Sequence, residues 1–359
     1  MVDTILHTRP FFDDLETRAL IKTIESRMVN EGDLANQLIS KIAQLISSAG
    51  GVSVSTGTLG LHLALKTMGV ESTADEVIIP DFACRCLYDC VKMAGGLPVL
   101  CDINLDDYSL SIDSVRLKLS NNTRAIILPH MYGCAADIDA FDGLKGLIIE
   151  DCAHSLGATY KGGAAGSFCA MSVFSFEGSK LIAAGEGGGV LANNSTMLER
   201  LNTLRYGLNG HFAYHYRLSD LIASVALVQI DKLPYMIQRR TYIANRYYSE
   251  LKIFEQQGFM KLPKYFSDRE SAYYRFVVLC DHNSDGLIDF ANQNGVLIRK
   301  PLISGCISDT YEDYKANNPN SKLLASNGAS LPIYPGLSDS GIAKVVDVIS
   351  AFYKFGGSR

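Results

Sequence analysis

Short apolar runs alternate with helical stretches through the first half of the chain. Runs that are apolar on both faces and separated by helices predict a parallel-rich sheet covered by helices on both sides, an α/β fold. The expected strands are Val52–Val54, Val77–Ile79, Leu97–Cys101, Ala125–Leu128 and Leu147–Ile149. The expected helices between them are Leu59–Met68, Ala83–Ala94 and Ile112–Leu119.

The short strand-like and helical segments in the second half of the chain predict a smaller α+β domain. Helices are expected at Leu218–Leu233, Met236–Phe254, Leu287–Asn292 and Gly341–Tyr353, with strands at Tyr274–Cys280 and Val296–Ile298. The polar stretch Ser304–Ser330 is expected to be a long surface loop. We therefore divide the chain into an N-terminal segment (1–35) packing with the small domain, a large cofactor-binding domain (36–235) and a small C-terminal domain (236–359).

Composition narrows the class of protein. With 359 residues, 47% of them hydrophobic and 20% charged, the chain can bury the core of a compact soluble enzyme. A formal net charge of −5 without a basic block does not favour nucleic acid or an anionic membrane as partner. The N-terminus has no basic region followed by an apolar one, and the apolar runs are short. A cytoplasmic location without a membrane span is therefore expected.

The chain has nine cysteines, an odd number that cannot all be joined in disulfides within one chain. Cys84, Cys86 and Cys90 are spaced as CxC-x3-C, which fits common metal-site spacings poorly. Buried free thiols in a reducing compartment are the favoured interpretation.

The segment from Gly146 to Gly189 carries the clearest chemistry. The apolar run Leu147–Ile149 ends in Glu150 and Asp151, and a lone Lys180 precedes a glycine cluster. A carboxylate at the end of a buried strand needs a cationic partner, and a lysine on such a turn is a candidate Schiff-base nucleophile. Pyridoxal phosphate needs both, an acid for its ring nitrogen and a lysine for its aldehyde. The alternatives are a structural acid and a solvated surface lysine.

A phosphate site is expected at the turn Ser55-Thr56-Gly57-Thr58, which follows a strand and opens a helix. Free N–H groups at a helix N-terminus bind phosphate, Gly57 permits close approach and Thr58 adds a hydroxyl. An ordinary helix cap is the alternative. Because ligands of parallel sheets lie beyond the carboxyl ends of the strands, one pocket can collect Thr58, Asp151 and Ser175.

The motifs are, along the chain, the STGT turn, Glu150-Asp151-Cys152-Ala153-His154, Ser175 to Lys180 and the Gly-Glu-Gly-Gly run from Gly185. The order of these motifs resembles the DegT/DnrJ/EryC1/StrS family of sugar aminotransferases. The resemblance implies a fold-type I pyridoxal phosphate enzyme. It assigns Lys180 to the cofactor aldehyde, Asp151 to the pyridine nitrogen and His154 to the neighbourhood of the ring oxygen. It assigns Gly57, Thr58 and Ser175 to the phosphate, and places Glu186 in the loop beyond the lysine.

Two positions depart from the family pattern. Cys84 stands where an aromatic residue often covers the cofactor ring, and Phe82 could take that place in a shifted register. His215 stands where the family has an asparagine that the partner subunit donates to the phosphate. The resemblance thus implies a homodimer with sites at the interface, and a histidine can still donate to phosphate.

The implied reaction moves an amino group from an amino acid, with L-glutamate expected, to a keto-sugar, with a nucleotide-linked keto-deoxysugar expected. A non-nucleotide keto-sugar or cyclitol is the alternative acceptor, and selectivity is assigned to Arg299–Pro301 and Ser304–Ser330. A related sugar dehydratase would have histidine in place of Lys180. A non-catalytic binding or regulatory protein would lack the lysine or the acid. A Rossmann dehydrogenase would need GxGxxG where the chain has STGTLG.

Overall fold

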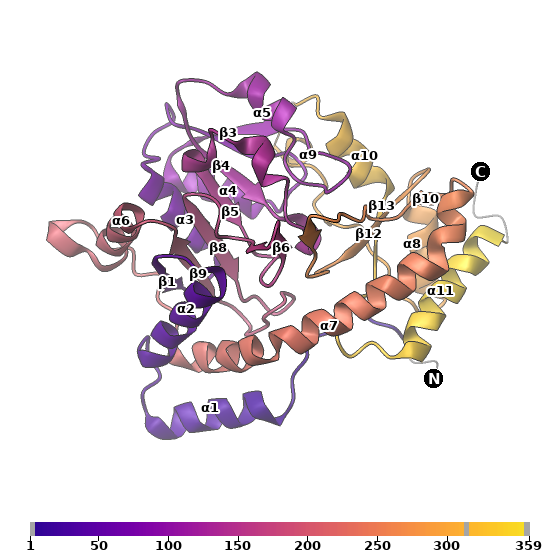
Figure 1. The fold of residues 1–359 in the computed structure, drawn as a ribbon, viewed down its shortest axis with the longest axis horizontal. Coiled ribbons are helices and arrows are strands. Elements are labelled where there is room, and N and C mark those ends of the chain that lie inside the picture. Colours follow the sequence, from indigo (N-terminus) through magenta and orange to yellow (C-terminus); the bar gives the residue numbers. More distant parts are fainter. Residues whose placement is uncertain (1–3, 312–315, 355–359) are drawn as a thin grey trace.

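The computed structural model describes residues 4–311 and 316–354, and its centre is a seven-stranded sheet (Figure 1). The strand order is β1 (Gly50–Val54), β9 (Gly188–Ala192), β8 (Met171–Ser175), β5 (Ile148–Asp151), β4 (Thr123–Pro129), β2 (Glu76–Pro80) and β3 (Leu97–Cys101). β9 pairs antiparallel with both of its neighbours, and the other pairs are parallel. The predicted α/β class with a parallel-rich sheet is confirmed, and five strands were located from their apolar runs.

Helices cover both faces of this sheet. On one face, α3 (Gly57–Met68), α4 (Cys86–Ala94) and α6 (Ser195–Tyr206) bury residues such as Leu63, Val91 and Leu201 against the strands. On the other face lie α2 (Asp33–Ile46), the first half of α7 (Asp220–Gln256) and, beside β3 and β4, α5 (Ile112–Lys118). Because both faces are covered, the strands are apolar throughout.

The long helix α7 joins the two halves of the molecule (Figure 1). The two expected helices, Leu218–Leu233 and Met236–Phe254, are one helix of 37 residues with Pro234 inside it. Proline usually breaks a helix because it removes one hydrogen bond. Here Leu233 and Met236 on either side of the proline are buried in the core beneath the helix, and this packing keeps the helix continuous.

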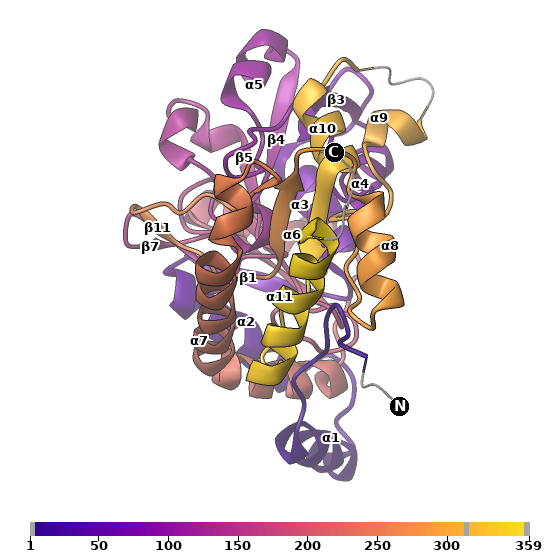
Figure 2. The same ribbon diagram turned by 90° about the vertical axis from the view of Figure 1, so that its right-hand side faces the viewer.

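The small half consists of the three-stranded antiparallel sheet β10 (Met260–Lys261), β12 (Phe276–Cys280) and β13 (Gly328–Leu331). α8 (Asp285–Gln293), α11 (Asp339–Lys354) and the end of α7 pack with it around one apolar core (Figure 2). The strand expected at Val296–Ile298 is wrong, because only Val296 forms a single bridge, to Ile5. A second small sheet, β6 (Thr159–Tyr160), β7 (Gly163–Ala164) and β11 (Arg269–Glu270), links the two halves.

The expected surface loop Ser304–Ser330 is also wrong. The segment contains α9 (Ile307–Thr310), α10 (Pro319–Asn327) and most of β13, while residues 312–315 lie outside the described part. Its polar side chains are bound by two acids at strand ends. Asp81 accepts hydrogen bonds from Ser308 Oγ (2.8 Å) and Asn318 Nδ2 (3.0 Å), and Asp102 accepts one from Ser321 Oγ (2.8 Å).

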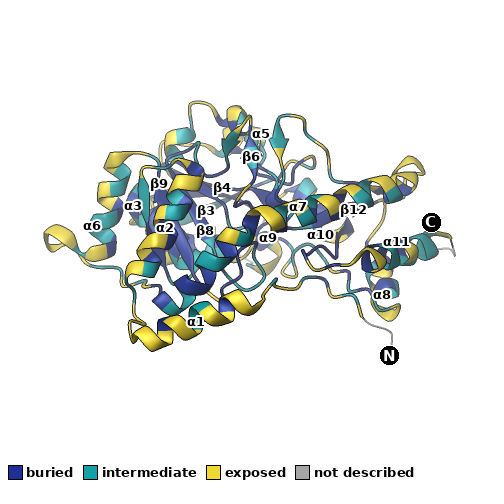
Figure 3. Ribbon diagram, turned by 60° about the horizontal axis from the view of Figure 1, so that its bottom comes forward, coloured by how far each residue is buried: buried dark blue, intermediate teal, exposed yellow. Residues whose placement is uncertain are grey.

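The N-terminal segment contacts both halves. Ile5 pairs with Val296, and the His7 ring lies 3.0 Å from Ser330 Oγ, 323 positions later. α1 (Asp14–Ser26) then packs along α7, where Glu16 accepts hydrogen bonds from Lys232 and Gln229, and it leaves its outer face exposed (Figure 3). None of the helices within 4–311 and 316–354 combines the length and apolarity that a membrane crossing needs.

Candidate active site

A cavity of about 420 Å³ lies at the carboxyl ends of β5 and β8, beside the N-terminus of α3. Seven of the eight residues expected at the site line it: Gly57, Thr58, Cys84, Asp151, His154, Ser175 and Lys180. Glu186 lies at its edge as well. Parallel strands deliver their last residues to one edge of a sheet, which is why positions far apart in sequence meet here.

Asp151 ends β5 and is 9% exposed. Within the described residues its carboxylate accepts a single hydrogen bond, from the Ala153 N–H (3.0 Å). Burial raises the pKa of Asp151, while that N–H and the charge of Lys180 oppose the rise. A buried carboxylate with one partner is incompletely satisfied, so this group is suited to a cationic ligand atom.

The adjacent acid, Glu150, points to the other face of the strand and has a different role. Its Oε2 lies 2.9 Å from His130 Nε2 and 2.8 Å from the Gly166 nitrogen. Its Oε1 accepts the N–H groups of Phe168 and Cys169, both at 2.8 Å. Four donors satisfy this carboxylate, so Glu150 holds the following loop to the strand.

Cys152 lies close enough to His130 and Glu150 to form a group that could hold a metal ion. The hydrogen bonds oppose that use. The His130 Nδ1 accepts from the Ala136 N–H (3.1 Å), and its Nε2 faces Glu150. Both ring nitrogens therefore already have protein partners, and the cluster is structural.

Lys180 stands on the turn between β8 and β9, where its backbone N–H binds the Glu177 carbonyl (2.8 Å). In the described part of the chain its Nζ makes no hydrogen bond and lies 5.2 Å from the centre of the Tyr274 ring. Burial lowers the pKa of Lys180, but the opposing charges of Tyr274 and Asp151 outweigh it and the pKa is raised. The amine is therefore a cation in the protein alone.

A close contact shapes the turn at the start of α3, where a phosphate site is expected. The first N–H groups of α3 have no intrahelical partners, and Thr56 caps one of them by accepting the Leu59 N–H (3.1 Å). A Cβ atom at Gly57 would lie 2.9 Å from Ser175 Cβ, closer than real Cβ contacts. Glycine is therefore required for α3 to approach β8 and bring Thr58 and Ser175 to one place.

His154 is held between two tyrosine rings. It stacks on Tyr274 at 4.2 Å between centroids and lies parallel to Tyr132 at 6.2 Å. Burial, together with the charges of Lys180 and Arg275, holds its pKa well below the usual value, so the ring is neutral. The Tyr274 hydroxyl lies 3.2 Å from both Ser179 Oγ and Arg275 Nη2, which fixes the ring that supports His154.

Of the two residues considered for the ring-facing position, Cys84 lines the cavity and is exposed. The shifted register with Phe82 is wrong, because Phe82 is fully buried in a separate apolar cluster. All nine cysteines are free, but Cys84 is exposed, whereas the sequence predicted buried thiols. A hydrogen bond from Cys86 and the charge of Lys180 lower the pKa of Cys84 to about 6, although burial opposes the shift.

His215, the eighth expected residue, is not brought to the cavity within one chain. It lies exposed on the loop between α6 and α7, with its Nδ1 3.5 Å from Arg217 Nη2. Sequence reasoning missed Tyr274, Met131 and Glu177. Tyr274 lies 94 positions after Lys180, and no local pattern marks it as a neighbour of the site.

The lining suits the three ends of pyridoxal phosphate. Among the described residues Asp151 forms no direct ion pair and Lys180 Nζ makes no hydrogen bond. The first N–H groups of α3, beside Thr58 and Ser175, have no intrahelical partner. These groups match a pyridinium, an aldehyde and a phosphate respectively.

Comparison with known proteins decides the family. The sequence profile described as the DegT/DnrJ/EryC1/StrS aminotransferase family matches residues 11–350. The chain belongs to this family. It is therefore a pyridoxal-phosphate-dependent aminotransferase, as expected from the motifs.

The similarity to known proteins covers nearly the whole chain. A GDP-perosamine synthase of Vibrio cholerae is 29% identical over 364 residues, covering 96% of this chain and 98% of its own. A GDP-perosamine synthase of Escherichia coli O157:H7 is 28% identical, covering 90% and 91%. The crystal structure of the aminotransferase TlmJ from Streptoalloteichus hindustanus superposes with a TM-score of 0.91 at 24% identity, covering 98% and 99%, which confirms the fold.

Proposed function

We propose that this enzyme transfers the amino group of L-glutamate to a nucleotide-linked keto-deoxysugar. The observation that carries the assignment of the site is the meeting of Lys180 with the incompletely satisfied Asp151 in one cavity. The similarity to GDP-perosamine synthases over 96% of the chain supports a nucleotide sugar as the acceptor and makes GDP-linked keto-deoxysugars the first to test.

Each lining residue has a defined task in this proposal. Lys180 Nζ binds the cofactor aldehyde and Asp151 holds the proton on the ring nitrogen. Gly57, Thr58 and Ser175 bind the phosphate through N–H and hydroxyl groups, helped by the α3 dipole. His154, neutral and fixed by stacking on Tyr274, donates to the ring oxygen. When bound, the cofactor supplies a cationic conjugated ring that accepts the electron pair released at the substrate carbon.

Lys180 also moves the proton. In the protein alone, Asp151 and Tyr274 favour its charged form. Beside a cationic ring the balance reverses, because a like charge disfavours protonation. The neutral amine can then take the proton from the donor carbon and return it at the adjacent position. By keeping the proton on the ring nitrogen, Asp151 would let the ring accept that electron pair.

We further infer a homodimer with His215 completing the partner's phosphate site. His215 lies exposed on a loop with large exposed apolar side chains nearby, Leu208 (49%) and Phe212 (77%). Such exposed apolar groups favour a protein contact. The nine free thiols support a reducing, cytoplasmic location.

Borohydride reduction of the holoenzyme followed by peptide mapping tests the site. The label should be on Lys180. Lys145 and Lys161 are the matched internal controls, because both are paired with Asp139 at the surface. A label on either of them, or on any other lysine, would overturn the assignment.

The acceptor is tested by adding keto-sugars to the pyridoxamine form and following the return of the pyridoxal absorbance. GDP-linked and other nucleotide-linked keto-deoxysugars should react, whereas free keto-sugars and cyclitols should not. A faster reaction with a free sugar or a cyclitol would refute the nucleotide assignment while leaving the aminotransferase chemistry intact.

A further inference from the structure

A second cavity of about 450 Å³ lies between the two halves of the molecule and adjoins the first, since Met131 lines both. Its walls come from the loops after β3 and β4, from α7 and from the segment between β10 and β12. Six aromatic side chains surround it, and we call it the tyrosine cavity: Tyr108, Tyr132, Tyr248, Tyr265, Phe266 and Tyr273.

Backbone strain is concentrated in this cavity. Tyr108 (φ 59°), Tyr132 (φ 58°) and Tyr273 (φ 45°) all have left-handed backbone conformations. They are three of the seven non-glycine residues with positive φ among those described. The conformation is unfavourable for a bulky side chain, and strained residues cluster at ligand sites. Tyr108 and Tyr132 are 6% and 5% exposed and meet edge to face, so two of the strained rings lie deep in the protein.

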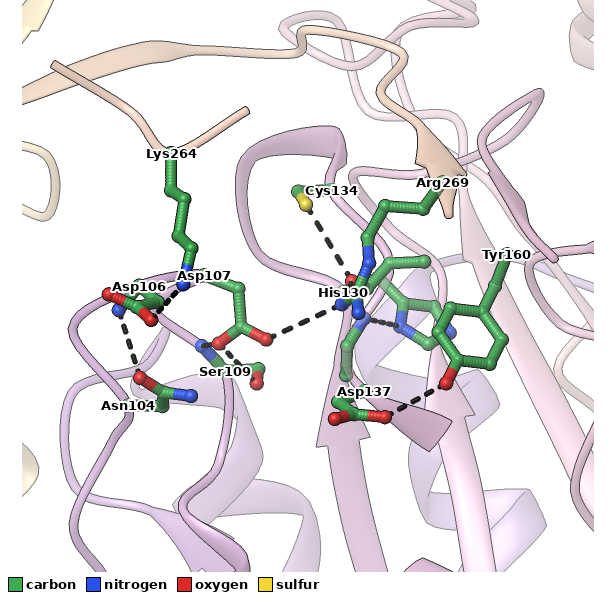
Figure 4. A network of polar contacts seen from close by, with 12 residues as sticks. Asn104, Asp106, Asp107, Ser109, His130, Cys134, Asp137, Tyr160, Lys264 and Arg269 are labelled. Carbon is green, nitrogen blue, oxygen red and sulfur yellow. Dashed lines mark hydrogen bonds and ion pairs between the residues drawn. The ribbon is translucent and has the colours of Figure 1, made fainter. Parts of the chain in front are cut away.

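Two of the cations at the cavity are paired with acids. The third, Arg275, contacts the His7 ring (2.7 Å) and the Tyr274 hydroxyl (3.2 Å) instead. Lys264 Nζ lies 2.5 Å from Asp106 Oδ2, and Arg269 binds Asp268 at 2.9 Å (Figure 4 shows Lys264 and Arg269 directed toward the loop of Asp106 and Asp107). Lys264 and Arg269 are therefore not free to bind an anion, and the aromatic walls suit a neutral ring.

One buried acceptor at the cavity is incompletely used. Asp107 is 4% exposed, and its Oδ1 accepts both the N–H (3.0 Å) and the hydroxyl (2.7 Å) of Ser109. Its Oδ2 has Arg269 Nη1 at 3.7 Å, beyond hydrogen-bond distance (Figure 4). On α7, the side chains of Thr241 and Asn245 line the same cavity and form no hydrogen bond with any described residue. A ligand that donates a hydrogen would complete this set.

We propose that the tyrosine cavity is a second binding site, which takes a neutral planar aromatic ring bearing an N–H or O–H donor. The ring packs against the tyrosine faces and its donor binds Asp107 Oδ2. This site is separate from the Lys180 cavity and does not depend on the identity of the amino acceptor.

The test uses two probes of equal shape, indole and benzofuran, which differ by an N–H in place of a ring oxygen. Saturation-transfer NMR on the holoenzyme should show indole binding at least about tenfold more tightly, as expected for a hydrogen bond to a charged acceptor. Soaked crystals should show indole beside Asp107. Equal affinity of the two probes, no binding, or density only in the Lys180 cavity would overturn the proposal.

A variant pair tests the location in solution. Asn245→Trp fills the cavity from an exposed position on α7 and should weaken indole binding at least about tenfold. Asn292→Trp makes the same change at an exposed position of α8 that does not line the cavity, and binding should not change. Equal effects of the two substitutions would refute the assignment.

Discussion

Substitutions of the two adjacent acids on β5 are expected to have different effects: a change at Asp151 should reduce turnover, and a change at Glu150 should reduce stability. Asp151→Asn keeps an oxygen that can accept the Ala153 N–H, the single hydrogen bond of the carboxylate in the described structure. Its cost in folding free energy should therefore stay within about 1 kcal/mol. Turnover should fall far more, because an amide cannot hold the proton on the ring nitrogen. Loss of a buried ion pair costs about 3–5 kcal/mol, which is on the order of 10²- to 10⁴-fold in rate.

Glu150→Gln should do the reverse. One carboxylate oxygen becomes an NH₂ group facing two donors, so two hydrogen bonds to a charged acceptor are lost at about 1.5–3 kcal/mol each, or about 3–6 kcal/mol together. With an unfolding entropy of about 2.1 cal/mol/K per residue, 359 residues give ~0.75 kcal/mol/K. The melting temperature should fall by about 4–8 °C, against about 1 °C for Asp151→Asn.

Two assays on the same samples check this pair. Stopped-flow half-reactions with L-glutamate measure the chemical step, and thermal unfolding of the cofactor-free protein measures stability. A near-normal half-reaction in Asp151→Asn would show that Asp151 is only a structural acid. An unchanged melting temperature in Glu150→Gln would refute the role assigned to the four hydrogen bonds of Glu150.

Three further results are expected. Gly57→Val should weaken retention of the cofactor at least about tenfold, because its Cβ would lie 2.9 Å from Ser175 Cβ. Gly146→Val, where a Cβ meets open space, should leave retention unchanged. Equal retention in the two variants would disprove the packing argument. His215→Ala should weaken retention by about 1–3 kcal/mol without changing the stability of the monomer fold, and normal retention on dialysis would exclude it from the phosphate site. In cofactor-free protein, alkylation at Cys84 should rise through pH about 6, because the lowered pKa makes the thiolate prevail above that pH; a rise only near pH 9 would contradict this.

The central sheet could be predicted because its strands are buried on both faces. Runs such as Val77–Ile79 and Leu147–Ile149 have no polar interruption, and a parallel strand between two helical layers requires this pattern. The same rule placed Asp151, Ser175 and Thr58 at one edge of the sheet, where the structure brings them into one cavity.

The failures arose where distant residues decide local structure. Ser308, Asn318 and Ser321 are typical of a loop in composition, but Asp81 and Asp102 bind them from the ends of β2 and β3. No local pattern contains that information. Tyr274 was missed for the same reason, since its contacts with Lys180 and His154 exist only after the small half has folded.

The tie between His7 and Ser330 has a consequence during protein synthesis. The two residues are separated by 323 positions, and ribosomes add about 5–20 residues each second. The N-terminal segment therefore waits roughly 15–65 s before its partner has been made. For most of that interval the backbone of Ile5, which pairs with Val296 in the folded protein, is also unpaired, so the nascent chain exposes backbone that other chains could bind. Newly made chains should depend on chaperones until translation has passed Ser330.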